Sequence, residues 1–300
     1  MRNYRLTLSL LLITGQLLSA SGAELSSGLY SVMQTWAQEA AFPRPYHVSV
    51  PPKKLVKPNP VFIFLHGNGG TAERAKSQIT NRYPHIAQQY IMVFPHGYQE
   101  SWNIVSERSK ADDRGFIEAI IKQLITFDNV QQDTLSIMGV SNGAALVNQL
   151  AIESQLPNIK NYISSVSPLN RFQHDGTHFR AKGPNNTYRA IAKPKTGRRL
   201  MNISGTEDRL IPYAGGPSLR IPAKGGKLEF LSAEESIFLW AKHMGYKGKK
   251  LAAPSQTDGK LESYSYLNGD IIHYKVIGEG HGATAAISES LLLKFLANTP

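Results

Sequence analysis

Cysteine is absent from this chain of 300 residues. The protein therefore has no disulfide bond, no thiol nucleophile and no thiolate metal ligand, so its fold must rest on its hydrophobic core. The sequence also lacks the motif H-E-x-x-H and any cluster of histidines and carboxylates with metal-ligand spacing. We expect neither a metal nor a cofactor.

The sequence has no uninterrupted apolar run as long as the ~20 residues that a membrane-spanning helix requires. Its positive start, MRNYR, is followed by LTLSLLLITGQLLSASGA, an apolar run that a glycine and several polar residues interrupt. With small residues at Ser21 and Ala23, this pattern is typical of a signal peptide, and the alternative is a membrane anchor. We expect residues 1–23 to be a signal peptide cleaved near Ala23, and the protein to be secreted or periplasmic without stable membrane insertion.

Acidic residues are the minority among the charges, with 22 Asp and Glu against 33 Lys and Arg and a net charge of +11. Such a surplus is compatible with nucleic acid, an anionic surface or an acidic ester as partner, and equally with an ordinary solvated surface. Charge therefore does not select a function. The length and the hydrophobic content of 41% suit one large domain over residues 24–300.

Residues 134–150 read as a short apolar strand, a sharp turn and a helix. In the turn, Gly139, Ser141 and Gly143 form G-x-S-x-G, the nucleophile elbow, whose tight geometry needs small residues around the serine. The motif alone is weak in a chain with 25 glycines, and its alternative is an ordinary turn with an N-capping serine. Other parts of the chain must decide between the two.

Alternation of strand-like and helix-like segments predicts an α/β fold, with a mostly parallel sheet covered by helices on both faces. Two aspartates, Asp112 and Asp113, are expected to cap a helix, and Ser232 begins a capping box. The pattern predicts strands at 61–65, 90–94, 134–140, 162–166, 200–203 and 271–277, an edge strand at 47–50, and helices near 30–39, 116–125, 232–243 and 287–297.

Three chemically matched residues each follow a predicted strand: Ser141, Asp208 and His281. Their chain order is the one found in α/β-hydrolases, and the carboxyl ends of parallel strands meet at one edge of a sheet. A histidine base would activate the serine, and an aspartate would orient the histidine. The rival acid is Glu207, whose side chain should diverge from its neighbour's. We assign structural or surface roles to His47, His66, His243 and His273.

Two loops are further candidates for the site. The glycine-rich turn 66–70 directly follows the predicted strand 61–65, where backbone N–H groups can form an oxyanion hole together with the residue after the nucleophile. The alternative is a flexible turn. Trp102, on an irregular segment, would line a substrate cleft or merely cover the edge of the core.

The long polar segment 170–199 separates two predicted strands by 30 residues, whereas such connections usually have ~2 to 6. It carries eight Lys and Arg against one acid, Asp175, interleaved with three aromatic residues. It is either a cationic lid over the site that attracts carboxylate-bearing esters, or a solvated excursion.

The chain resembles the polyhydroxybutyrate depolymerase and feruloyl esterase family of secreted α/β-hydrolases. The resemblance rests on LHGNGGTA from Leu65, SWN from Ser101, DDRGFIEAII from Asp112, GVSNGA from Gly139, SGTEDRLIPYAGG from Ser204 and GEGHG from Gly278. It implies an α/β-hydrolase fold with Ser141 as nucleophile, Asp208 as acid and His281 as base, and the backbone N–H groups of Asn68 and Asn142 as oxyanion hole. The family's cysteines, and the Thr-Trp-Pro that usually continues its histidine loop, are missing here.

These observations predict a secreted serine carboxylesterase acting through an acyl-enzyme, with hydroxyalkanoate polyesters or oligomers as substrates and Trp102 as a substrate-binding residue. Feruloyl or acetyl esterase activity on plant polysaccharide is the alternative within the enzyme class. A non-catalytic binder of anionic polymers is the alternative outside it. We expect an ester as the partner molecule and no nucleic acid.

Overall fold

The computed structural model describes residues 22–52 and 57–297. Nearly all of the expected signal peptide, residues 1–21, lies outside this range. Within the range, no helix combines the length and apolar character needed to cross a membrane.

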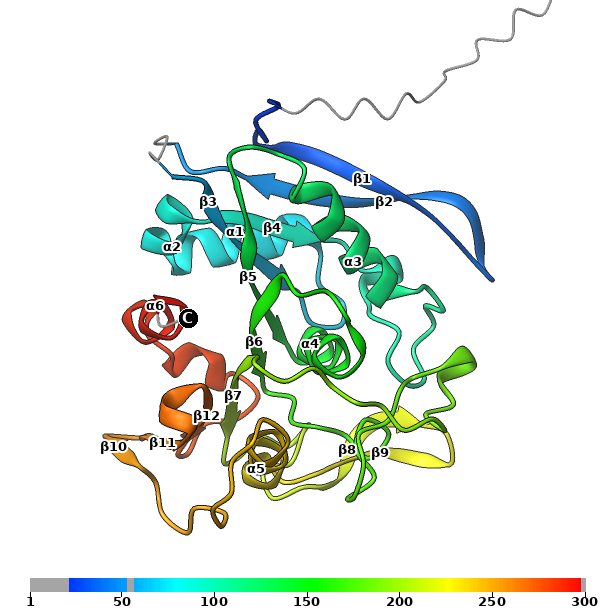
Figure 1. The fold of residues 1–300 in the computed structure, drawn as a ribbon. Helices are drawn as coiled ribbons and strands as arrows, with labels where there is room; N and C mark the ends of the chain where they lie inside the picture. Colours follow the sequence, from blue (N-terminus) through cyan, green and yellow to red (C-terminus); the bar gives the residue numbers. More distant parts are fainter. Residues whose placement is uncertain (1–21, 53–56, 298–300) are drawn as a thin grey trace, which may run out of the picture.

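A ten-stranded sheet forms the centre of the molecule (Figure 1), and its strand order is β1-β2-β4-β3-β5-β6-β7-β12-β11-β10. The six strands from β4 to β12 in this order are parallel, and the two outer strands on each side are antiparallel. The strands of the sheet are β1 (Gly28–Trp36), β2 (Glu39–Ser49), β3 (Asn59–Leu65), β4 (Ile91–Pro95), β5 (Val130–Val140), β6 (Ile159–Ser165), β7 (Arg199–Gly205), β10 (Gln256–Asp258), β11 (Leu261–Tyr266) and β12 (Ile271–Val276).

Helices cover both faces of this sheet, as the sequence predicts (Figure 1). One face carries α1 (Ala72–Arg82), α2 (Pro84–Gln89) and α6 (Glu289–Ala297), and the other carries α3 (Asp113–Leu124), α4 (Asn142–Glu153) and α5 (Ala233–His243). A separate two-stranded sheet, β8 (Gly216–Ala223) with β9 (Gly226–Phe230), lies beside residues 170–199 (Figure 1).

Strand β3 illustrates why an unbroken apolar run forms a central strand. Val61, Ile63 and Leu65 pack into the core under α3 and α4, whereas Phe62 and Phe64 pack into the core under α1. Alternate side chains of a strand point to opposite faces, so both sets must be apolar when both faces are covered. Each fully buried side chain of this size contributes ~1.5 to 3 kcal/mol.

The helix predicted near residues 30–39 is wrong, because this stretch is β1 and the start of β2. Tyr30, Val32 and Gln34 are half-buried, while the residues between them, such as Leu29 and Met33, are exposed. This period of two is the period of a strand. The predicted edge strand at 47–50 is also corrected, since β2 pairs with β4 on one side and with β1 on the other, leaving β1 at the edge.

The remaining predicted elements are confirmed. Asp112 caps α3 by accepting the Gly115 N–H at 3.0 Å, and Ser232 caps α5 by accepting the Glu235 N–H at 3.2 Å. Asp113 is the exception, because its carboxylate pairs with Arg44 at 2.7 Å instead of capping. That ion pair is almost fully buried and joins β2 to the start of α3.

Residues 170–199 are a folded part of the domain and not a solvated excursion. Asn170, Gln173 and Arg198 are buried. The Gln173 amide donates to the Ala145 carbonyl at 2.7 Å, and the Arg198 guanidinium donates to the Ala151 carbonyl at 2.7 Å. These bonds attach both ends of the segment to α4.

Candidate active site

The turn between β5 and α4 holds Ser141 in a strained conformation, with φ 55° and ψ −119°. A positive φ is uncommon for a residue with a side chain, and such strain gathers at functional sites. Glycine is required on both sides of the serine. A Cβ on Gly139 would collide with the Gly143 backbone, and a Cβ on Gly143 would collide with the Leu65 carbonyl. The turn therefore fixes Ser141 at the carboxyl edge of the sheet.

The structure brings together the three residues that the sequence selects. His281 Nε2 lies 3.0 Å from Ser141 Oγ, and His281 Nδ1 lies 2.7 Å from Asp208 Oδ2. The three residues follow β5, β7 and β12, so the parallel sheet aligns the loops that carry them. With a proton on Nδ1 and none on Nε2, the imidazole can accept the serine proton.

Asp208 is held as a carboxylate beside the histidine. Burial raises its pKa, but the hydrogen bonds from His281 and from the N–H groups of Ile211 and Leu210 outweigh that effect and lower the pKa below its usual value. Those two N–H groups bind Oδ1 at 3.0 and 2.8 Å, leaving Oδ2 for the imidazole. The rival acid, Glu207, is exposed and makes no contact with His281 among the described interactions.

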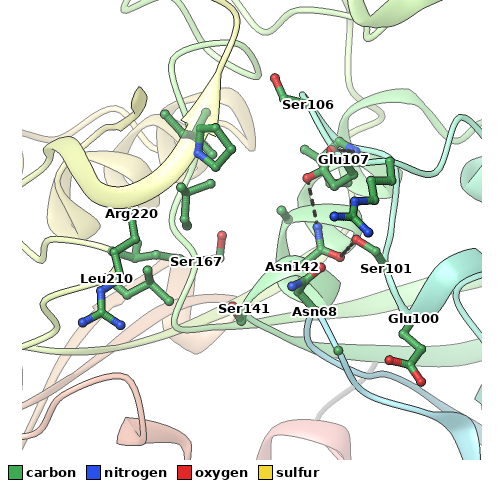
Figure 2. A pocket seen from close by; sticks show the side chains of 18 of the residues that line it. Asn68, Glu100, Ser101, Ser106, Glu107, Ser141, Asn142, Ser167, Leu210 and Arg220 are labelled. Atoms are coloured by element: carbon green, nitrogen blue, oxygen red, sulfur yellow. Dashed lines mark hydrogen bonds between the residues drawn. The ribbon is translucent and has the colours of Figure 1, made fainter. Parts of the chain in front are cut away.

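The two expected oxyanion donors lie next to Ser141 in Figure 2. Asn142 is the first residue of α4, where helix N–H groups have no partner within the helix. Asn68 lies in the loop after β3 and lines the same cavity as Ser141. The two residues therefore remain candidates for binding the negative charge that a carbonyl oxygen beside Ser141 would develop.

The side chain of Asn142 is clamped from three sides. Its Oδ1 accepts the Trp102 N–H at 2.7 Å, and its Nδ2 donates to the Trp102 carbonyl at 3.0 Å. The Nδ2 also donates to Glu107 Oε1 at 3.2 Å (Figure 2). Because these bonds fix the side chain, they also fix the backbone N–H of the same residue.

Glu107 is a cavity residue that the sequence analysis did not identify. Its Oε2 accepts the N–H groups of Ile104 and Val105 at 2.8 and 2.6 Å, while Oε1 accepts from Asn142. Burial raises the pKa of this carboxyl above its usual value, although the hydrogen bonds oppose the shift. No sequence motif marks the residue, because its partners are backbone groups of an irregular loop.

Trp102 does not contact the cavity, so its expected role as a substrate-binding residue is wrong. The indole is fully buried in the hydrophobic core and donates its Nε1 hydrogen to the His66 carbonyl at 2.8 Å. A large apolar ring gains more from burial than from an exposed loop position. Trp102 acts on the site indirectly, through backbone bonds to Asn142.

His66 has the structural role that the sequence analysis assigns to it. Its Nε2 accepts the Gly97 N–H at 3.0 Å, and its Nδ1 lies 2.8 Å from the Gly67 carbonyl. Burial lowers its pKa to about 4, so the ring is neutral and both nitrogens serve the backbone. This histidine fixes the loop that carries Asn68.

A cavity of about 660 Å³ opens beside Ser141. We call it the Ser141 cavity. Apolar and polar residues both line it, and Arg220 and Glu100 lie at opposite ends in Figure 2. Its apolar wall consists of Ile104, Ala145, Leu210, Ile211, Ile221, Pro222, Leu228 and Phe230.

Half of these apolar residues, Ile221, Pro222, Leu228 and Phe230, belong to the β8–β9 hairpin. The sequence analysis did not predict this hairpin. Its turn, Lys224-Gly225 between paired Ala223 and Gly226, is a two-residue turn with Gly225 at φ 87°, a recognisable hairpin signal. The segment 170–199 does not form the expected lid over the cavity. Of the described residues that line the cavity, none comes from that segment.

Residues 170–199 instead brace the cavity wall from behind. The Tyr188 hydroxyl donates to the Ile104 carbonyl at 2.8 Å, and the Asn186 amide donates to the Val105 carbonyl at 2.9 Å. On the other side, the Arg171 N–H donates to the Glu229 carbonyl of β9 at 2.9 Å. The segment therefore supports both the loop at Ile104 and strand β9, although none of its residues lines the cavity.

No protein-family model matches the chain, and no curated protein does. Several solved structures are similar to it. A thermostable esterase has 10% identity and a TM-score of 0.56, with 91% of this chain and 63% of that chain covered. An acetyl xylan esterase from Aspergillus awamori has 13% identity and a TM-score of 0.56, with 90% of this chain and 99% of that chain covered.

A further similar structure is esterase 2 of Thermogutta terrifontis, phosphorylated by paraoxon, at 13% identity and a TM-score of 0.50 over 91% of both chains. This chain thus spans less than two thirds of the thermostable esterase, at 63%, but nearly all of the other two. At such identities the likeness concerns the fold alone, and membership of the polyhydroxybutyrate depolymerase and feruloyl esterase family stays a prediction. Together with the parallel sheet and its two helical layers, these similarities show that the chain has the α/β-hydrolase fold.

Proposed function

We propose that this protein is a serine carboxylesterase that cleaves esters through an acyl-enzyme, with Ser141 as nucleophile, His281 as base and Asp208 as orienting acid. The observation that carries this proposal is the continuous chain of contacts from Ser141 Oγ to His281 at 3.0 Å and on to Asp208 at 2.7 Å. The strained serine and the adjacent backbone N–H groups support it.

In the first half of the reaction, Ser141 Oγ attacks the ester carbonyl carbon while its proton moves to His281 Nε2. The carbonyl oxygen becomes an oxyanion, bound by the N–H groups of Asn68 and Asn142. The bond between the carbonyl carbon and the alcohol oxygen then breaks, and His281 returns the proton to that oxygen. The alcohol leaves, and the acyl group remains on Ser141.

In the second half, water attacks the acyl carbon and gives a proton to His281. The bond to Ser141 Oγ breaks, the serine regains the proton, and the carboxylic acid is released. Asp208 stays ionised throughout and stabilises the imidazolium, in agreement with its lowered pKa.

For the substrate, we propose esters of hydroxyalkanoic acids, as polymers or oligomers. The apolar wall of the Ser141 cavity supports this, because it suits a short aliphatic acyl chain. The experiment compares hydroxybutyrate oligomers, feruloyl esters and acetylated xylan at equal concentration, with Ser141→Ala as control. Preference for feruloyl or acetylated xylan esters would replace our substrate class by the polysaccharide esterase alternative.

Labelling by a fluorophosphonate probe tests the reaction class separately. We expect the protein to be labelled at Ser141, and Ser141→Ala to lose both labelling and esterase activity. An unlabelled protein that binds acidic polymers in a salt-dependent manner would instead be the non-catalytic binder. Export, which we also propose from residues 1–23, is tested by mass spectrometry of the mature N-terminus.

A further inference from the structure

A second hollow, of about 600 Å³, lies on the other side of the catalytic residues. We call it the α1 groove. It is lined by α1, by the glycine-rich loop after β3 and by the segment that follows His281. Residues of α1 and its cap that face it are Thr71, Arg74, Ala75, Gln78, Ile79 and Arg82.

The two hollows divide the catalytic residues between them. The Ser141 cavity is lined by Ser141 but not by His281, whereas the α1 groove is lined by His281 but not by Ser141. Asn68 of the oxyanion hole borders both. An ester bound at Ser141 can therefore extend in two directions from its carbonyl carbon.

The chemistry of the proposed reaction decides which part of the ester enters which hollow. His281 must hand its proton to the leaving oxygen, so the alcohol part has to lie on the His281 side. The α1 groove thus receives the alcohol, and the Ser141 cavity receives the acyl chain. This assignment rests on the proposed function of the site.

The charges of the two hollows differ in a way that selects the alcohol. Arg74 and Arg82 line the α1 groove, and none of its described lining residues is acidic. The Ser141 cavity, by contrast, is lined by two acidic and two basic residues. These are Glu100, Glu107, Arg108 and Arg220. An anionic alcohol is favoured in the first hollow but not in the second.

Only one of the two groove arginines is free to bind a ligand. The Arg82 guanidinium donates to the Ala285 carbonyl at 2.7 Å and so forms part of the wall. Arg74 is exposed, and in the described part of the chain its guanidinium pairs with no carboxylate. Its neighbour Glu73 is directed to His47, at 3.1 Å, and to His96, at 3.8 Å.

We propose that the α1 groove binds an alcohol that carries a carboxylate, and that Arg74 is the residue that binds this carboxylate. The preferred substrate is then an ester whose alcohol part is itself a hydroxy acid with a free carboxyl end. In an oligomer of hydroxy acids this is the last ester bond before the free carboxylate, so the enzyme would release the terminal hydroxy acid.

The test uses three small esters that place the charge differently. In 3-acetoxybutyrate the carboxylate is on the alcohol part, in 3-acetoxybutyramide that group is neutral, and in monomethyl succinate the carboxylate is on the acyl part. For Arg74→Gln we expect KM for 3-acetoxybutyrate to rise roughly three- to tenfold, the range of a charge-assisted pair on an accessible surface. We expect the other two esters to be unaffected, and the preference of the wild type to weaken with salt.

Lys76→Gln is the matched control, because it removes the same charge from the same helix at a position that does not line the groove. An equal effect of Lys76→Gln, or a rise in KM for the neutral amide with Arg74→Gln, would overturn carboxylate binding by Arg74. A rise for monomethyl succinate would reverse the assignment of the two hollows. Failure of the wild type to cleave any of the three esters or to react with the fluorophosphonate would instead reject the proposed function.

Discussion

The catalytic edge of the sheet and the wall of the Ser141 cavity are held in place by different forces. At the edge, Ser141, Asp208 and His281 follow directly from strands whose positions the backbone ladder sets. At the wall, irregular loops are held by carboxylates that bind backbone groups, such as the half-buried Glu107 and the buried Asp113. The fold fixes the chemistry at the first region, whereas individual polar contacts fix the shape at the second.

The largest expected effect tests the catalytic edge. Asp208→Asn should lower kcat by about 10³- to 10⁴-fold, because an amide no longer enforces the tautomer that lets His281 accept the serine proton. Glu207→Gln is the matched control and should leave kcat unchanged, since Glu207 is exposed. Steady-state kinetics on one ester decides this, and the opposite pattern would make Glu207 the acid.

The second prediction concerns a substitution that removes polar contacts behind the cavity wall and leaves the three residues of the catalytic edge unchanged. Asp113→Ala leaves Arg44 as an unpaired buried charge and removes the acceptor of the Asn103 N–H, which lies at 2.6 Å. Loss of one partner of a buried ion pair costs roughly 3 to 5 kcal/mol of stability. Urea unfolding should show this loss, whereas Asp112→Ala should cost only ~1 kcal/mol, as a lost helix cap does. Equal losses for the two variants would contradict the contrast.

The third prediction concerns the pH dependence of stability. His66, near the catalytic edge, and His273, within β12, are buried, which lowers their pKa values to about 4 and about 3. Below pH ~6.5 the unfolded chain binds protons at these histidines that the folded chain does not, so stability falls as the pH is lowered toward 4. The expected loss is on the order of 3 kcal/mol for each histidine.

Urea unfolding at pH 7 and pH 4 measures this loss. Gln132→Asn provides the control, because it alters an exposed residue without a titratable side chain and should leave the slope of stability against pH unchanged. His273→Asn, in contrast, should flatten that slope. A slope that is the same in wild type and His273→Asn would show that protonation of this residue does not limit acid stability.

The two regions also differ in how far the sequence predicts them. The sequence predicts that Ser141, Asp208 and His281 meet, because G-x-S-x-G, a strand-end aspartate and a glycine-flanked histidine are local signals that the parallel sheet converts into proximity. The strand β1 was missed because half-burial leaves it with the mixed composition of a surface helix.

The cavity wall was the least predictable part. Trp102 was assigned to the cleft because its loop position is visible in the sequence, whereas its burial depends on packing against the core. Residues 170–199 were expected over the site because both ends lie near its edge. Their actual place is set by contacts with α4 and with the backbone of Ile104, which no local pattern encodes.

The smallest expected effect tests whether Glu107, in the cavity wall, affects kcat through its hydrogen bond to Asn142. Glu107→Gln keeps an oxygen for the N–H groups of Ile104 and Val105, but turns an amide NH2 toward Asn142 Nδ2, which is itself a donor. The loop should therefore stay in place while the Asn142 side chain loses an acceptor. In the proposed mechanism the same residue supplies an oxyanion N–H, so we expect kcat to fall about three- to tenfold, a weakening of ~0.7 to 1.4 kcal/mol, with KM nearly unchanged.

The rate of inactivation by a fluorophosphonate should fall in parallel with kcat, since its phosphoryl oxygen would use the same N–H groups. Glu100→Gln is the matched control, as it alters an exposed carboxylate of the same cavity that makes no contact with Asn142 among the described interactions. If Glu107→Gln raised KM and left kcat intact, the carboxylate would contact substrate instead of positioning Asn142. The wall would then contribute to binding alone, and the catalytic edge would be independent of the loops around it.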